Sequence, residues 1–166
     1  MELWDLYDKD KNLTGKIHER GTRIEDGYYH LVVHVWIKNK EGKYLISRRD
    51  KERESYPLFL ECPGGSVLKG ETSLDGAIRE TFEEVGIDLN NIPGKVIHTK
   101  IREHFHDIFD AWLFSYDGEV DLSKATTNEV CEVMWMTLDE IKESLNKKEF
   151  VPTLKYILEI GDKNEL

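Results

Sequence analysis

The chain has 166 residues, enough for one domain that buries about two-thirds of the surface of its unfolded chain. Its formal net charge of −10 argues against binding to a nucleic-acid polymer or to an anionic membrane surface. The two cysteines, Cys62 and Cys131, are too few for a disulfide scaffold and lack zinc-ligand spacing. With no signal-peptide pattern and no long apolar run, we expect a cytoplasmic protein that does not enter a membrane.

The expected elements are mainly strands, interrupted by one helix and followed by two more. The first two strands, at 3–7 and 15–20, flank a polar turn and suggest a hairpin within an N-terminal extension of residues 1–27. Further strands are expected at 28–37, 43–48, 96–103, 108–116 and 130–136. Helices are expected at 72–85, 138–145 and 152–160. This order predicts a mixed α+β fold in one domain, 1–166.

The expected central helix carries three glutamates close together. Glu80 and Glu84 are one turn apart and Glu83 lies beside them, although like charges at these spacings cost about 0.2–0.5 kcal/mol per pair. We expect Thr72 and Asp75 to cap the start of this helix. We also expect an apolar stripe along one side of it, formed by Leu74, Ala77, Ile78, Phe82 and Val85. Three adjacent carboxylates go against the preference of a helix for avoiding like charges on one face, and such an exception is typical of a functional site.

Gathered carboxylates suit a hard divalent cation. Mg²⁺ takes oxygen ligands and often lies between carboxylates and substrate phosphates. The preceding Pro63-Gly64-Gly65 predicts a tight turn where backbone could approach a ligand closely. We expect Arg79 to orient a carboxylate by an ion pair, with Glu71 as the first candidate. The alternative is an acidic helix face that is simply solvated.

The spacing from Gly65 to Ile87 resembles the Nudix box, Gly-x5-Glu-x7-Arg-Glu-U-x-Glu-Glu-x-Gly-U, in which U is aliphatic. Only Thr81 departs from the box, at a position expected to pack behind the helix. The resemblance to the Nudix superfamily covers about 28–160 and implies a mixed β-sheet sandwiched between helices. It also implies that Mg²⁺ or Mn²⁺ is held by a set of groups on the box and the preceding loop: Glu80, Glu83, Glu84 and the backbone carbonyl of Gly64.

Residues outside the box are candidates for catalysis and substrate binding. Glu129 lies six residues before Trp135, which resembles the spacing of a metal-assisting glutamate in mutator-type pyrophosphohydrolases. An ordinary glutamate at the start of a strand is the alternative. Arg48 or Arg49 could clamp a phosphate, and Phe105 could stack on a base, although surface and core roles are equally open.

A second resemblance, in the N-terminal half, is to type I isopentenyl-diphosphate isomerases. Cys62 falls near their cysteine position, and His30 matches one of their metal-binding histidines. However, Gly64 and Arg23 stand where further histidines are expected, and the isomerases have a degraded box. We therefore place the chain with hydrolases that share this isomerase-like front end.

These patterns predict a metal-dependent pyrophosphohydrolase that cleaves a small-molecule substrate, a nucleoside diphosphate linked to another moiety. Arg79 would orient the site, and Glu83, Glu84 or Glu129 would orient or deprotonate the attacking water. The alternatives are the isomerase and a non-catalytic nucleotide-binding regulator. The N-terminal extension could also build a homodimer interface.

Overall fold

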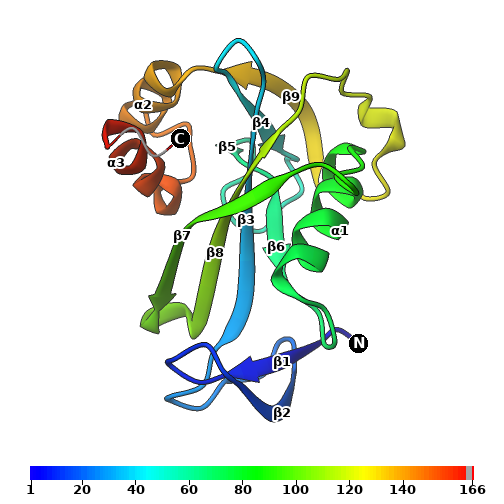
Figure 1. Cartoon of the computed structure of the whole chain (residues 1–166), viewed down its shortest axis with the longest axis vertical. Coiled ribbons are helices and arrows are strands. Elements are labelled where there is room, and N and C mark those ends of the chain that lie inside the picture. The colour runs from blue at the N-terminus through cyan, green and yellow to red at the C-terminus, as the bar shows by residue number, and fades with distance from the viewer. Residues whose placement is uncertain (164–165) are drawn as a thin grey trace.

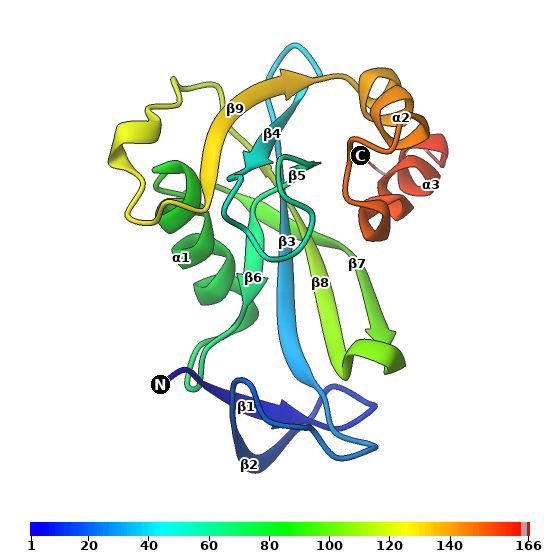
Figure 2. The ribbon, with the colours of Figure 1, turned by 180° about the vertical axis from the view of Figure 1, so that it is seen from behind.

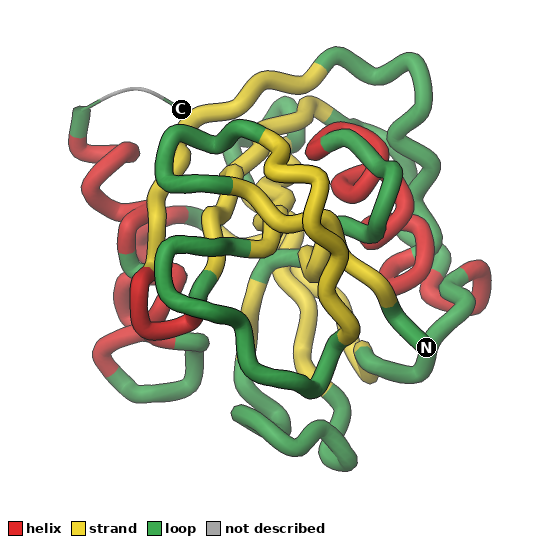
Figure 3. The backbone as a smooth tube through the Cα atoms, turned by 90° about the horizontal axis from the view of Figure 1, so that it is seen from below, coloured by secondary structure: helices red, strands yellow, loops and turns green. Residues whose placement is uncertain are grey.

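The computed structural model describes residues 1–163 and 166, which form an α+β fold. A mixed sheet runs through the middle, with α1 (Ser73–Val85) on one side and α2 (Leu138–Asn146) and α3 (Tyr156–Asp162) on the other (Figure 1). The view from below shows the same three layers (Figure 3). The predicted mixed sheet between helices is therefore confirmed. None of the described helices is both long and apolar enough to cross a membrane.

Within the described residues, the main sheet has seven strands. They are β3 (His30–Lys38), β4 (Tyr44–Arg49), β5 (Leu60–Glu61), β6 (Gly64–Ser66), β7 (Gly94–Arg102), β8 (Asp107–Ser115) and β9 (Val130–Met136). The longer strands begin and end within two residues of the ranges expected from the sequence. The last expected helix is divided into a 3₁₀ turn, Pro152–Leu154, and α3.

Strand β3 is the centre of the sheet and is buried on both faces. Val33, Val35 and Ile37 pack towards the cluster that contains Ala77 of α1, whereas Trp36 packs in the cluster that contains α2 and α3 side chains. Burial on both faces explains why this strand reads as a nearly continuous apolar run. It pairs in parallel with β8 along its whole length.

The sheet opens between β3 and β4, and this opening positions the site. These two strands pair only at Lys38 with Tyr44 and then separate. The chain segment between β4 and α1 fills the gap, because β5 pairs with β4 and β6 pairs antiparallel with β3. Figure 2 shows β6 lying beside β3 on the way to α1.

The expected tight turn at Pro63-Gly64-Gly65 is wrong, since both glycines belong to β6 and neither has a positive φ. Close packing, rather than turning, requires a glycine at position 64. A Cβ at Gly64 would overlap the carbonyl oxygen of Val33 on the neighbouring strand. The pair of glycines resembles a turn in sequence, but here it allows two backbones to approach.

Helix α1 forms with the predicted capping pair. Thr72 and Asp75 make a capping box, and Gly86 ends the helix in the left-handed conformation. The expected apolar stripe is partly wrong, because Leu74 and Phe82 are 41% and 40% exposed. The buried side of the helix combines small, polar and apolar residues: Gly76, Ala77, Thr81, Glu84 and Val85. Thr81 is fully buried, as expected for this position of the box.

The first residues form the expected hairpin, a separate two-stranded sheet of β1 (Leu3–Tyr7) and β2 (Leu13–Glu19). The hairpin lies across the end of β3 (Figure 1). The Trp4 ring stacks on the His30 ring with 3.9 Å between centroids. The division of the chain into domains stays a prediction.

A buried carboxylate attaches the hairpin to the rest of the fold. Asp110 on β8 is fully buried and accepts hydrogen bonds from Lys11 in the hairpin turn at 2.6 Å, from Ser73 of α1 at 2.6 Å and from Thr99 of β7 at 2.7 Å. Removing one partner of a buried, hydrogen-bonded charge leaves the other uncompensated, so the contact fixes the hairpin firmly.

His30 should make the stability of this hairpin contact sensitive to acid. Burial, then the positive charge of Arg102, lowers the pKa of His30 from 6.5 to about 4. Below pH 6.5 the unfolded chain binds a proton at His30, whereas the folded protein does not until about pH 4. The free energy of unfolding should therefore fall by about 3 kcal/mol between pH 6.5 and pH 4. The variant His30→Phe keeps a ring against Trp4 but cannot titrate. Urea unfolding from pH 7 to pH 4 should therefore show a smaller loss for the variant; parallel pH profiles would contradict this account.

Candidate active site

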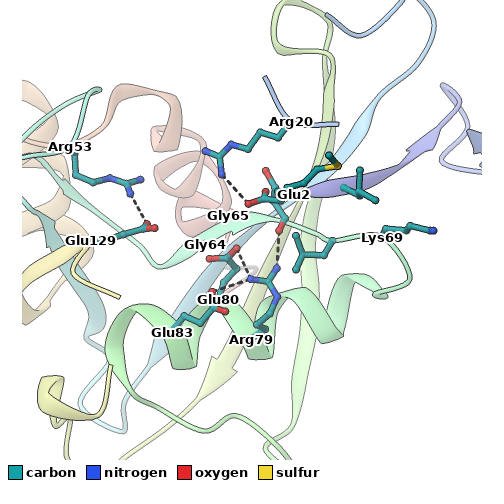
Figure 4. A pocket seen from close by; sticks show the side chains of 14 residues that line it. Glu2, Arg20, Arg53, Gly64, Gly65, Lys69, Arg79, Glu80, Glu83 and Glu129 are labelled. Carbon is teal, nitrogen blue, oxygen red and sulfur yellow. Dashed lines mark hydrogen bonds and ion pairs between the residues drawn. The ribbon is translucent and has the colours of Figure 1, made fainter. Parts of the chain in front are cut away.

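Two cavities flank strand β6 and share residues of it. The larger, about 600 Å³, is lined by Glu80 and Glu83 of α1, by Glu129 and by the N-terminal hairpin (Figure 4). The smaller, about 250 Å³, lies on the other side and includes Glu84. Three residues line both cavities: Arg53, Gly64 and Gly65. The glutamates of the helix are therefore divided between two connected faces of one site.

The Arg79 guanidinium organises the carboxylates of the larger cavity. Its Nε donates to Glu71 at 2.8 Å, and its Nη1 donates to Glu80 at 3.0 Å and to Glu83 at 3.1 Å. Nη2 donates to the Ser66 carbonyl oxygen at 2.9 Å, which ties the helix to β6. The ion pair of Arg79 with Glu71 expected from the sequence is present, and the guanidinium also holds two other box glutamates.

The box glutamates are buried to different degrees. The Glu83 side chain is 35% exposed and that of Glu80 is 14% exposed. Glu84 is buried, and its Oε2 accepts a 3.3 Å hydrogen bond from the Gly64 backbone N–H. Burial and two neighbouring carboxylates, Glu83 and Glu129, raise the pKa of Glu80 to about 7 despite Arg79. The pKa of Glu84 is raised well above its usual range, first by burial.

A further glutamate belongs to this group but was not identified from the sequence. Glu61 on β5 lines the smaller cavity beside Glu84 and raises the pKa of Glu84 by its charge. Arg49 donates to both Glu61 oxygens at 3.0 and 2.8 Å, yet burial still raises the pKa of Glu61. The available signal was its position immediately before Cys62-Pro63-Gly64, but only the tertiary fold shows that it faces α1.

The predicted loop carboxylate, Glu129, reaches the site. The backbone N–H groups of Thr126 and Thr127 both donate to the Glu83 carbonyl oxygen, at 2.9 and 3.1 Å, so this loop is attached to the end of α1. The Glu129 carboxylate forms an ion pair with Arg53 at 2.7 Å, and its side chain is 40% exposed. Arg53 was not identified as a site residue from the sequence, because it lies in a strongly charged loop in which no single arginine stands out.

Other predicted residues lie apart from the cavities or serve different contacts. Arg49 lines the smaller cavity, but its guanidinium is occupied by Glu61. Neither cavity includes Arg48, which pairs with Glu132 at 2.7 Å, or Phe105, which is half exposed and lies against Arg102. A direct substrate contact by Arg48 or Phe105 stays a prediction that this geometry does not support.

His30 and Cys62, the residues matched to the isomerase resemblance, have packing roles, and so does His34 on the same strand as His30. His30 stacks on Trp4, and His34 contacts Tyr156 through a 2.8 Å hydrogen bond. Burial lowers the pKa of His34 to about 3, so its ring is neutral. Cys62 lines the smaller cavity, where burial raises its thiol pKa well above the usual value.

The chemistry of the site fits a divalent cation. The pKa values of Glu61, Glu80 and Glu84 are all raised, first by burial and then by neighbouring carboxylates that include Glu129, which is unfavourable unless positive charge is added. A Cβ at Gly65 would lie 2.5 Å from the Glu80 carboxyl group, so the glycine leaves room for that carboxylate. Among the described residues, no group of three or more His, Cys, Asp or Glu is placed so that it could already hold a metal ion. Arg79 pairs with Glu80 and Glu83, and Arg53 pairs with Glu129.

The fold and the glutamate helix define a Nudix domain. The family model described as NUDIX domain matches residues 28–157. A protein of Listeria innocua described as an uncharacterized Nudix hydrolase is 39% identical over 156 residues, covering 92% of this chain and 89% of that protein. The chain therefore belongs to the Nudix hydrolase family, and the predicted hydrolase class is confirmed at that level.

Two further comparisons concern the fold and the second resemblance. A crystal structure of a Deinococcus radiodurans protein superimposes with a TM-score of 0.74 at 19% identity, covering 90% of this chain and 92% of that chain. An isopentenyl-diphosphate Delta-isomerase of Citrobacter koseri is 25% identical over 88 residues, which span 52% of this chain and 49% of that protein. The isomerase resemblance is thus present but covers less of the chain.

The two glycines of β6 should respond differently to substitution. Gly64→Ala would press a methyl group against the Val33 backbone, which cannot move away cheaply, and should cost about 1–3 kcal/mol of stability. The atoms nearest to a Cβ at Gly65 belong to the flexible end of Glu80, so Gly65→Ala should lose little stability. Urea denaturation of both variants provides the comparison, and equal losses would contradict these packing assignments.

Proposed function

We propose that the protein is a metal-dependent pyrophosphohydrolase that cleaves the diphosphate bond of a nucleoside diphosphate linked to another moiety. The observation that carries the proposal is the collection of buried carboxylates around β6. Glu80 and Glu84 have raised pKa values and lie beside Glu61 and Glu129. Burying such a group of carboxylates has a high cost in isolation. A bound divalent cation would offset their negative charge and allow a phosphorylated substrate to bind beside them.

Glu80, Glu83, Glu84 and the carbonyl oxygen of Gly64 would hold Mg²⁺ or Mn²⁺. When bound, the ion would neutralise phosphoryl oxygens and lower the pKa of a bound water. Arg79 keeps Glu80 and Glu83 close to the cavity before binding, and the Gly64 N–H does the same for Glu84. These contacts arrange the oxygen ligands in advance, so fewer side chains must be ordered on binding.

In the hydrolysis step, a water oxygen forms a bond to one phosphorus while the bridging P–O bond breaks. The leaving phosphate keeps the bonding electron pair, and the water proton passes to a carboxylate. Glu129 is the first candidate for that acceptor, because it lines the larger cavity and is partly exposed. Glu83 and Glu84 are the alternatives. Most of the rate in such transfers comes from positioning and charge neutralisation.

Isomerisation of isopentenyl diphosphate is a second candidate, favoured by one observation. Cys62 and Glu84 line the same small cavity, so a thiol and a carboxyl group face one space. Two observations argue against the isomerase: the His30 ring is stacked on Trp4, and Gly64 and Arg23 stand where that family is expected to have histidines. Conversion of isopentenyl to dimethylallyl diphosphate that is lost in Cys62→Ala would establish this function.

Tight nucleotide binding without turnover under any metal would instead favour a non-catalytic nucleotide-binding regulator.

Substrate hydrolysis should depend on the buried box glutamate. Purified protein with Mg²⁺ should hydrolyse at least one member of a panel of nucleoside diphosphate sugars, dinucleotides, nucleoside triphosphates and coenzyme A. Glu84→Gln should lower turnover by about 100-fold or more. The matched control is Glu132→Gln, because Glu132 is an exposed glutamate outside both cavities. Activity that remains in the double variant Glu80→Gln/Glu84→Gln would contradict the assignment of these residues as metal ligands.

Metal binding should also be visible without any substrate. A ligand that binds only the folded state raises the unfolding temperature by mass action. Millimolar Mg²⁺ or Mn²⁺ should therefore raise the melting temperature of the wild type and of Glu132→Gln. Glu84→Gln should show a much smaller rise, because it lacks a carboxylate in the ligand set. The same rise in all three proteins would place the metal elsewhere.

A further inference from the structure

One wall of the larger cavity comes from outside the segment matched by the NUDIX domain model, residues 28–157. Glu2 and Leu3 at the start of the hairpin, and Arg20 directly after β2, line the cavity together with Gly64 and Glu80. In Figure 4, the Arg20 side chain extends from the hairpin into the space above Gly64 and Glu80. The hairpin is thus part of the site and brings a cation to it.

This wall is held in place by direct contacts with the loop that begins the Nudix box. The Lys69 backbone N–H donates to the Leu3 carbonyl oxygen at 2.8 Å, and the Gly70 N–H donates to the Asp5 carboxylate at 2.8 Å. The contact of Lys11 with buried Asp110 fixes the far end of the hairpin. The position of the wall relative to α1 is therefore set by hydrogen bonds at both ends.

Arg20 is supported by its neighbours but remains accessible. Its backbone N–H donates to the Glu2 carbonyl oxygen at 3.0 Å, and its Nη1 donates to the Glu2 carboxylate at 3.2 Å. The second Glu2 oxygen accepts from Trp4 Nε1 at 2.8 Å. The Arg20 side chain is 64% exposed, so its ion pair with Glu2 is weak enough for a phosphate to replace.

The other two arginines of this cavity are already committed to the site's own carboxylates. Arg79 pairs with Glu71 and two further box glutamates, and Arg53 pairs with Glu129 at 2.7 Å. Within the described part of the chain, the only ion-pair partner found for Arg20 is Glu2. A diphosphate carries several negative charges and must approach a chain of net charge −10, so an available cation opposite the glutamates has a clear use.

We propose that Arg20 binds a phosphate group of the diphosphate substrate on the side that faces the hairpin, displacing the Glu2 carboxylate. Its planar guanidinium suits bidentate contact with phosphate oxygens. The hairpin then selects for substrates whose diphosphate extends across the cavity from Glu80 to Arg20. This inference rests on the proposed function, because it assigns a phosphate-binding residue to the same reaction.

Steady-state kinetics on the panel member with the fastest turnover provide the first test. Arg20→Ala should raise KM about tenfold with little change in kcat, because the contact forms on binding, and Arg20→Lys should recover part of the loss. Glu2→Gln should lower KM, since the amide oxygen can still accept from Trp4 but the competing charge is gone. The matched control is Lys16→Ala, a hairpin cation outside this cavity, which should leave KM unchanged.

A binding measurement separates this inference from the hydrolase proposal. Imidodiphosphate is an analogue of diphosphate in which a P–N–P bridge replaces the hydrolysable P–O–P bridge. Its affinity in the presence of Mg²⁺ is measured by calorimetric titration into the wild type, Arg20→Ala and Lys16→Ala. Weaker binding to Arg20→Ala alone supports the inference even if the panel shows no hydrolysis, an outcome that would reject only the hydrolase proposal. Equal KM and equal affinity in Arg20→Ala and Lys16→Ala would overturn it. So would a change in kcat alone, or absence of both imidodiphosphate binding and turnover in the wild type.

Discussion

Glu80 and Glu83 are held at the larger cavity by the Arg79 guanidinium, which is bonded to both of them, to Glu71 and to the backbone of β6. Without a cation at this place, adjacent glutamates on one helix would repel each other and turn towards solvent. Arg79 instead keeps Glu80 and Glu83 at the cavity and holds the loop at Glu71 against the helix. The helix can therefore present a dense negative surface and remain folded.

The second requirement is space for backbone at the centre of the sheet. Because β3 and β4 separate after a single pair, the segment containing Glu61 and Gly64 can enter between them and bring β6 under α1. Gly64 can approach the Val33 backbone only because it lacks a Cβ. The opening in the sheet thus provides both the buried setting of Glu84 and the close backbone contact beside it.

The regular elements could be predicted because their signals are local. The apolar run of β3, the cap at Thr72 and the pairing of Arg79 with Glu71 follow from spacing and periodicity, and all are present. The failures have a common cause, since they depend on what packs against a segment. Two glycines look like a turn until a neighbouring strand is known, and Glu61 is unremarkable until it faces Glu84. Arg20 lies in the turn directly after β2, far along the chain from the helix whose glutamates line the same cavity.

The hairpin also has a practical consequence for recombinant work. Met1 lines the larger cavity, so a purification tag or protease-cleavage remnant fused ahead of it would emerge at that cavity. Such extra residues could block ligand entry or supply a stray histidine to the carboxylates. The opposite terminus, Leu166, packs with the cluster at α2 and α3, away from the hairpin (Figure 1). A carboxyl-terminal tag therefore leaves the cavity unobstructed.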